Sequence, residues 1–187
     1  MDSVAKPPLM KKQTIQFMRG LALIPFLATS SQFTVLQNQI SSILPIKITT
    51  EESRAIATRQ DRAFKIDAYF AKRDMPLEGY VSKMVAEAEE NDIDWRLLPA
   101  IAIKESTGGK FACEYNPFGW GSCKLKFKSF DDAIETVARN LGGNNPNTER
   151  YYKDKTLIEK LHHYNNSVVP TYTAEILEFM DLVEQGE

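Results

Sequence analysis

The alternation of apolar and polar positions along the chain predicts a mainly helical protein built around one helix that is buried on all sides. Residues 97–103 read LLPAIAI, and a helix without a polar face has to be enclosed by the rest of the protein. The run ends at Gly108 and Gly109, which tolerate the left-handed conformation that closes many helices. Asp94 is a plausible N-cap, and Pro99 either marks the first helical position or kinks the second turn.

Two amphipathic helices flank this run along the chain. Residues 78–90 place apolar side chains on one helical face and charged side chains on the other. Residues 129–141 repeat apolar positions at the same spacing, with Ser129 as the N-cap and Asp132 in the acidic position of a capping box.

The rest of the chain carries weaker patterns. Residues 60–77 lead into the folded domain. The residues of this segment that we expect to be buried are Phe64, Ile66, Tyr69 and Phe70. Alternating apolar residues favour a short strand at 124–128. A capping box at Thr156 predicts a short helix through about residue 161, and a last helix is expected to start near Pro170. The predicted fold class is mainly α with at most a short β segment.

The first 32 residues have the pattern of an export signal or of a short membrane anchor. Basic residues precede an apolar run at 21–28, which is shorter than the roughly 20 residues that span a bilayer. A buried or frayed N-terminal helix is the alternative. We interpret residues 33–59 as a linker, although residues 49–52 resemble a helix start, and residues 60–187 as the folded domain.

The distribution of charge changes along the chain. The composition, 43% hydrophobic and 26% charged, is that of a globular protein. Residues 1–59 hold seven basic and three acidic side chains, a balance of +4, whereas the remainder holds sixteen and twenty-two, a balance of −6. A protein that binds the phosphate backbone shows a basic surface, so the acidic body argues against a nucleic-acid partner.

The two cysteines, Cys113 and Cys123, enclose a loop rich in glycine, asparagine and proline. In an oxidising compartment they could close this loop with a disulfide, which agrees with export. The alternative is a pair of free thiols in a cytosolic protein. His162 and His163 lie too far along the chain to complete a recognised zinc spacing, so we expect neither a metal nor another cofactor.

Glu105 is the strongest candidate for chemistry. It falls in the last turn of the buried helix, where the partial negative charge of the helix end and the apolar surroundings both favour the neutral acid. We therefore expect its pKa to be raised, as a general acid requires. The alternative is a glutamate that turns out to solvent at a helix end.

Asn116, Phe118 and Trp120 belong to a sharp loop that follows Glu105, with the sequence NPFGWG at 116–121. Aromatic faces stack on the apolar faces of sugar rings, and amides bond to hydroxyl and acetamido groups. The alternative is that the two rings fill the core beneath the loop, which is our interpretation of Phe118 and stays open for Trp120.

Tyrosines make the C-terminal third aromatic. Tyr164 falls in a stretch that we predict to be non-helical, and we expect it to line a cleft. Tyr172 lies on the apolar face of the last helix, where core packing is the simplest interpretation, and Tyr151 is a further candidate for the cleft.

Most glycosidases use two carboxylates, and the second one is not evident here. Glu114, Asp131 and Asp132 are the candidates, but Asp132 has a capping role and the helix dipole stabilises the charge of Asp131. A substrate acetamido oxygen can replace the second carboxylate as the nucleophile.

Residues 78–184 resemble the lysozyme-like superfamily, and most closely its mannosyl-glycoprotein endo-β-N-acetylglucosaminidase-like (glucosaminidase) domain family. The motifs follow the family's order along the chain: Glu105-Ser106 at a helix end, the Asn-x-Phe-Gly loop at 116–119, the aromatic-Ser-aromatic approach to a helix at 127–130, and Tyr164 followed by Pro170-Thr171-Tyr172. The stretch between Tyr164 and Pro170 is longer than in the family and lacks its acid.

The resemblance implies a lysozyme-like fold and an exported hydrolase that cuts β-1,4 bonds at N-acetylglucosamine in peptidoglycan or a related polymer, with Glu105 as the general acid. The expected substrate contacts are Ser106, Asn116, Phe118, Trp120, Tyr151, Tyr164 and Tyr172. The alternatives are a glycan-binding module that does not cut and a hydrolase of amide bonds in peptidoglycan. We expect a monomer in the cell envelope or outside the cell, and membrane attachment through the N-terminus is left open.

Overall fold

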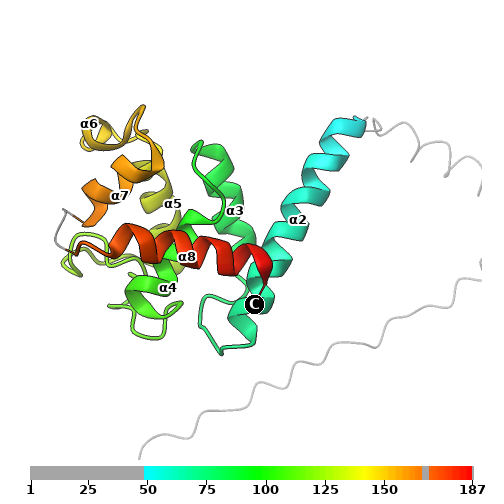
Figure 1. The fold of residues 1–187 in the computed structure, drawn as a ribbon, viewed down its shortest axis with the longest axis horizontal. Coiled ribbons are helices and arrows are strands. Elements are labelled where there is room, and N and C mark those ends of the chain that lie inside the picture. The colour runs from blue at the N-terminus through cyan, green and yellow to red at the C-terminus, as the bar shows by residue number, and fades with distance from the viewer. Residues whose placement is uncertain (1–48, 166–168, 187) are drawn as a thin grey trace, which may run out of the picture. The chain divides into compact units, whose positions relative to one another are not determined.

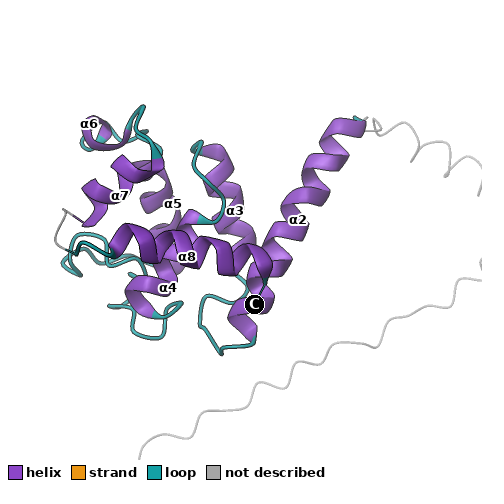
Figure 2. Ribbon diagram, in the orientation of Figure 1, coloured by secondary structure: helices purple, strands orange, loops and turns teal. Residues whose placement is uncertain are grey.

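Helices and the loops between them make up residues 49–165 and 169–186, which are the residues that the computed structural model describes (Figures 1 and 2). The helices are α2 (Thr50–Ala71), α3 (Val81–Glu90), α4 (Leu97–Ser106), α5 (Phe130–Leu141), α6 (Glu149–Tyr152), α7 (Leu157–Asn165) and α8 (Tyr172–Gln185). The mainly α prediction is confirmed for these residues.

The strand expected at 124–128 is absent, and the described residues form only one isolated β-bridge, between Cys113 and Asn116. A strand needs a neighbour with which to form a ladder of backbone hydrogen bonds. Here the carbonyl oxygen of Leu125 instead accepts a hydrogen bond from the Asn116 side chain at 3.3 Å. This segment is a loop that packs on the preceding loop.

Helix α4 lies at the centre of the described helices, as its sequence predicts. All seven residues from Leu97 to Ile103 are buried, and α3 and α8 pack against them. Arg96, directly before α4, donates to Glu184 of α8 at 2.5 Å. Pro99 is the third residue of the helix, where its missing N–H would have no partner within the helix, so it costs no hydrogen bond. Asp94 accepts from the Arg96 amide at 3.0 Å and closes the turn that leads into α4.

Helix α2 starts within the segment interpreted as a linker. Thr49 and Glu52 form a complete capping box, so residues 50–59 are helical and the expected linker does not extend through them. Arg59 pairs with Glu89 and connects this part of α2 to α3. The N-terminal half of α2 reaches away from the other helices (Figure 1).

The prediction of buried residues on α2 holds for Ile66, Tyr69 and Phe70 and is wrong for Phe64, which is 74% exposed. Residues two positions apart on a helix point about 200° apart, so Phe64 and Ile66 cannot face the same neighbour. Only one face of α2 packs on α3 and α8, and it contains Ile66.

Helix α5 begins as its capping pattern predicts, with one difference. The Ser129 hydroxyl accepts from the Asp132 amide at 3.2 Å, which is the expected cap. The Asp132 carboxylate accepts from the amide of Lys128 at 2.9 Å rather than from that of Ser129. Lys83 of α3 pairs with Glu135 at 2.5 Å and ties α5 to α3.

Residues 1–48 lie outside the described part of the chain, and with them the expected export or anchor segment and most of the expected linker. Among the helices that are described, none combines the length and the apolar character that a membrane crossing requires.

Candidate active site

Helix α4 ends one residue earlier than the glycine pair suggests. Thr107 adopts the left-handed conformation with φ of 53°, and Gly108 and Gly109 continue it. A Cβ atom at Gly108 would lie 2.5 Å from the sulfur of Met75. The chain therefore turns back against the Met75 side chain, which leaves Glu105 in the last turn of the buried helix.

The Glu105 carboxylate is held between α8 and the loop that carries Trp120. The Tyr172 hydroxyl donates to Glu105 Oε1 at 2.8 Å. A Cβ atom at Gly119 would lie 2.7 Å from Glu105 Oε2, closer than such contacts occur, so the carboxylate rests directly on the glycine backbone. Glu105, Tyr172 and Gly119 thus come together from three separate parts of the chain.

The environment of Glu105 raises its pKa, as expected from the sequence, although the dominant cause is the partial desolvation of the carboxylate by the surrounding protein. The hydrogen bond from Tyr172 and the charge of Lys104 act in the opposite direction. Lys104 itself pairs with Glu175 of α8. Glu105 as a whole residue remains exposed, although its carboxylate is partly desolvated.

The buried side chains of Ser106 and Asn116 stabilise the loop at 116–121 through hydrogen bonds to its backbone. The Ser106 hydroxyl donates to the Pro117 carbonyl at 2.7 Å and accepts from the Gly109 amide at 2.9 Å. The Asn116 amide, 1% exposed, donates to the Trp120 carbonyl at 2.8 Å and accepts from the Trp120 amide at 3.0 Å. Both side chains, which we expected to contact substrate, use their polar atoms to hold the loop.

The disulfide prediction is confirmed, since Cys113 and Cys123 are bonded with their Cα atoms 5.7 Å apart. Phe118 is also buried as interpreted, and because it has no exposed surface the expectation that it contacts substrate is wrong. The loop is thus closed at its base by a covalent bond and anchored at its centre by an aromatic ring. These two constraints fix the backbone of Gly119 against Glu105.

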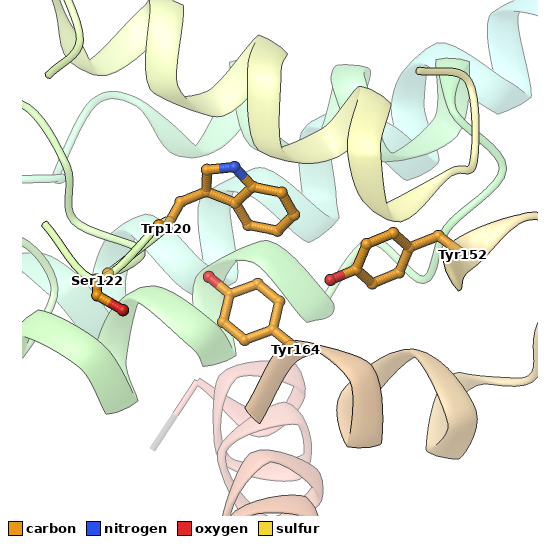
Figure 3. A pocket seen from close by; sticks show the side chains of 6 residues that line it. Trp120, Ser122, Tyr152 and Tyr164 are labelled. Carbon is orange, nitrogen blue, oxygen red and sulfur yellow. The ribbon is translucent and has the colours of Figure 1, made fainter. Parts of the chain in front are cut away.

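A cleft of about 330 Å³ opens beside Gly119. Figure 3 shows the rings of Trp120, Tyr152 and Tyr164 turned toward one another around it. The Trp120 ring centre lies 5.5 Å from that of Tyr164 and 6.0 Å from that of Tyr152. Gly121 and Ser122 complete the lining, so none of the described residues that border the cleft carries a charge.

Tyr164 lies within α7, and the prediction of a non-helical stretch there is wrong. The helix continues beyond residue 161 because Leu161 is buried in the core and Tyr164, one turn later, packs against it on the same side. The Tyr164 hydroxyl donates to the Phe118 carbonyl, and its ring stacks on that of Tyr172 at 6.2 Å. Tyr164 therefore links the cleft to the tyrosine that contacts Glu105.

Tyr152, which the sequence reasoning did not select, takes the place in the cleft that we expected for Tyr151. Tyr152 is 5% exposed and lines the cleft, whereas Tyr151 is 38% exposed and points away from it. Burial raises the pKa of Tyr152 to about 12, so its phenol stays neutral and is able to donate a hydrogen bond. Consecutive residues on a helix point about 100° apart. The adjacent tyrosines therefore indicate that only one of the two rings can face the cleft.

None of the three candidates for a second carboxylate is paired with Glu105. Glu114 pairs with Lys126 at 2.7 Å, Asp132 caps α5, and Asp131 lies on the exposed first turn of that helix. In the ranges 49–165 and 169–186, no group of His, Cys, Asp and Glu side chains is arranged to hold a metal ion. Of these four carboxylates, Glu105 is the one that contacts both Tyr172 and Gly119.

Comparison of the chain with models of protein families, with curated proteins and with solved structures finds no match.

Proposed function

We propose that this protein hydrolyses β-1,4 glycosidic bonds at N-acetylglucosamine residues of peptidoglycan or a related polymer, with Glu105 as the general acid. The observation that carries this proposal is the Glu105 carboxylate at the end of a buried helix. Its pKa is raised, one oxygen accepts from Tyr172, and the other rests on Gly119 beside an aromatic cleft.

The chemistry of such a site follows from its parts. Neutral Glu105 donates its proton to the glycosidic oxygen as the bond from that oxygen to the anomeric carbon breaks. The acetamido oxygen of the same sugar attacks the anomeric carbon, which makes a second carboxylate unnecessary as nucleophile. Water then adds to the anomeric carbon, the ring formed by the acetamido group opens, and ionised Glu105 takes the proton from the water.

The cleft suits a neutral sugar with an acetamido group. Trp120, Tyr152 and Tyr164 offer aromatic surface for the apolar face of a sugar ring, and the Tyr152 phenol can donate a hydrogen bond. The part of the chain that the structure describes contributes no charged side chain to its lining, so a strongly charged group would gain no ion pair from these residues. Exposed Cys113 and Cys123 are compatible with an oxidising compartment, which is where a cell-wall polymer is found.

Substitution of Glu105 by Gln tests the proposal, because the amide keeps the shape of the side chain but cannot donate the proton. We expect hydrolysis of peptidoglycan, followed as released reducing ends and by mass spectrometry, to fall by about 10²–10⁴-fold. Equal product formation by the wild type and the variant would refute the role of Glu105. Products cut at an amide bond would refute the glycosidic reaction.

A second function, glycan binding without cleavage, is favoured by one observation. Glu114 and Asp132 are engaged elsewhere and Asp131 lies on an exposed turn, whereas Trp120, Tyr152 and Tyr164 line the cleft together. Calorimetry with N-acetylglucosamine oligosaccharides, combined with product analysis of the same samples, separates the two functions. Binding without products supports the binding module, and released reducing ends exclude it.

A further inference from the structure

Helices α6 and α7 each carry a ring that lines the cleft and, directly before it in the sequence, a ring that does not. Tyr152 of α6 and Tyr164 of α7 are the inner rings that line the cleft. Tyr151 and His163, their neighbours in sequence, are the outer rings, and both are exposed. Because neighbouring helical residues point about 100° apart, each helix presents one ring to each side.

The outer rings contact each other and continue the aromatic surface of the cleft. The ring centres of Tyr151 and His163 are 5.5 Å apart. His163 also lies 6.4 Å from Tyr152, which lines the cleft. Aromatic contacts therefore run from Trp120 through Tyr152 and His163 to Tyr151. Figure 1 shows α6 and α7 side by side at the end of the body opposite α2.

Arg150 adds a positive charge at the outer end of this series of rings. Its guanidinium carbon lies 4.5 Å from the centre of the Tyr151 ring, and it donates to the Tyr151 hydroxyl. Within residues 49–165 and 169–186 no carboxylate forms a salt bridge with Arg150, whereas its neighbour Glu149 pairs with Lys153. A guanidinium held over a ring in this way remains able to bind a carboxylate through paired N–H groups.

We propose that Arg150, Tyr151 and His163 form a distal subsite, which binds a further sugar of a glycan chain whose other residues occupy the cleft. The inference rests on the proposed function for the identity of the ligand. The exposed rings of Tyr151 and His163 supply stacking surface, and Arg150 selects a sugar that carries a carboxylate substituent. The substrate class is therefore an extended glycan chain with acidic groups rather than a short neutral oligosaccharide.

The test uses the Glu105→Gln protein, in which the ligand is not consumed, and calorimetry with N-acetylglucosamine disaccharide and hexasaccharide. We expect the hexasaccharide to bind more tightly than the disaccharide. Addition of Tyr151→Ala should weaken hexasaccharide binding by about tenfold and leave disaccharide binding unchanged, since only the longer chain reaches the outer rings. Phe64→Ala, which removes a 74% exposed ring from α2, is the matched control and should change neither affinity.

The role of Arg150 is tested by Arg150→Gln in the same background. This change should weaken the binding of peptidoglycan oligosaccharides with carboxylate-bearing residues by about tenfold and leave the neutral hexasaccharide unaffected. Added salt should weaken the binding of the acidic ligand to the parent protein, and it should have little effect once Arg150 is replaced.

The outcomes separate this inference from the proposed function. Equal loss of disaccharide and hexasaccharide affinity in Tyr151→Ala, no loss of either, or no binding of any oligosaccharide overturns the distal subsite. If wild-type protein releases no products but chain-length-dependent binding is lost in Tyr151→Ala, the subsite stands and the hydrolase proposal fails. If wild-type protein hydrolyses the polymer and Tyr151→Ala has no effect at any chain length, the hydrolase proposal stands and the subsite fails.

Discussion

Replacement of Gly119 by Ala should disable the site through the addition of one methyl group. Gly119 has φ of +63°, in the left-handed region, and its Cβ position lies 2.7 Å from Glu105 Oε2. Real Cβ atoms essentially never approach another atom within 3.0 Å, so the carboxylate has to move. Since Oε1 accepts from the Tyr172 hydroxyl at 2.8 Å, a shift of the carboxylate also disturbs that hydrogen bond.

The two consequences of Gly119→Ala have different magnitudes. The left-handed conformation costs an alanine about 1–2 kcal/mol, which lowers the free energy of unfolding by that amount. For a domain of this size the melting temperature falls by roughly 2–4 °C for each kcal/mol. The displaced carboxylate affects catalysis far more, because a misplacement of about 1 Å reduces the rate by about 10²-fold.

Gly79→Ala is the matched control for this prediction. Gly79 has φ of +84°, and no atom lies within 4 Å of its Cβ position, so the added methyl group displaces no neighbour. Both variants therefore carry a similar backbone strain, but only one displaces the acid. We expect similar losses of melting temperature by calorimetry, together with a much larger loss of kcat/KM for oligosaccharide hydrolysis in Gly119→Ala. Equal losses of kcat/KM in the two variants would refute the reasoning.

Three further predictions concern the acid, its hydrogen-bond donor and the loop. Because the pKa of Glu105 is raised in the folded protein, protonation of this residue stabilises the fold. This stabilisation is fully present below the pKa of the unfolded chain, about 4.3, and is lost as the pH rises through the pKa of the folded protein. Urea unfolding should therefore show that Glu105→Gln is slightly more stable than wild type at neutral pH and similar to it near about pH 3. A variant that is less stable than wild type at neutral pH would contradict the raised pKa of Glu105. Tyr172→Phe removes a hydrogen bond that lowers the pKa of Glu105. The limb of the pH–rate profile that reports Glu105 ionisation should therefore move to higher pH. An unchanged limb would argue against the contact between Tyr172 and Glu105. Joint replacement of Cys113 and Cys123 by Ser should lower the free energy of unfolding by about 2–3 kcal/mol, measured with urea against the reduced wild type as a control that should match the variant.

Local interactions explain why much of the fold could be predicted from the sequence. The capping boxes at Thr49 and Thr156 and the cap at Ser129 lie within three residues of their partners, so the chain carries the whole signal for these helix starts. The burial of α4 follows from its composition alone, because no arrangement of that helix could present a polar face. The disulfide closes a loop of sequence separation 10, and its two cysteines are the only ones in the chain.

The errors arose where a residue's environment depends on distant parts of the chain. Phe64 and Ile66 are both apolar and lie on one helix, and only the position of α3 and α8 decides that one is exposed and the other buried. The expected strand at 124–128 had a suitable pattern, but no neighbouring strand exists among the described residues. Tyr164 lies in a helix because Leu161 and Tyr164 pack on the core together.

For the candidate site, the sequence determined that Glu105 ends a buried helix and that an aromatic loop follows it. Only the tertiary structure decided which groups touch the carboxylate. Tyr172 is 67 positions from Glu105, and Gly119 contributes through the absence of a side chain, which no local pattern reveals. The tertiary structure also turned Tyr152 toward the cleft and Tyr151 away from it, since the direction of each ring depends on how α6 packs. Residue types and their order can thus identify a candidate acid, whereas its protonation and its access to a ligand are set by groups that folding brings together from separate parts of the chain.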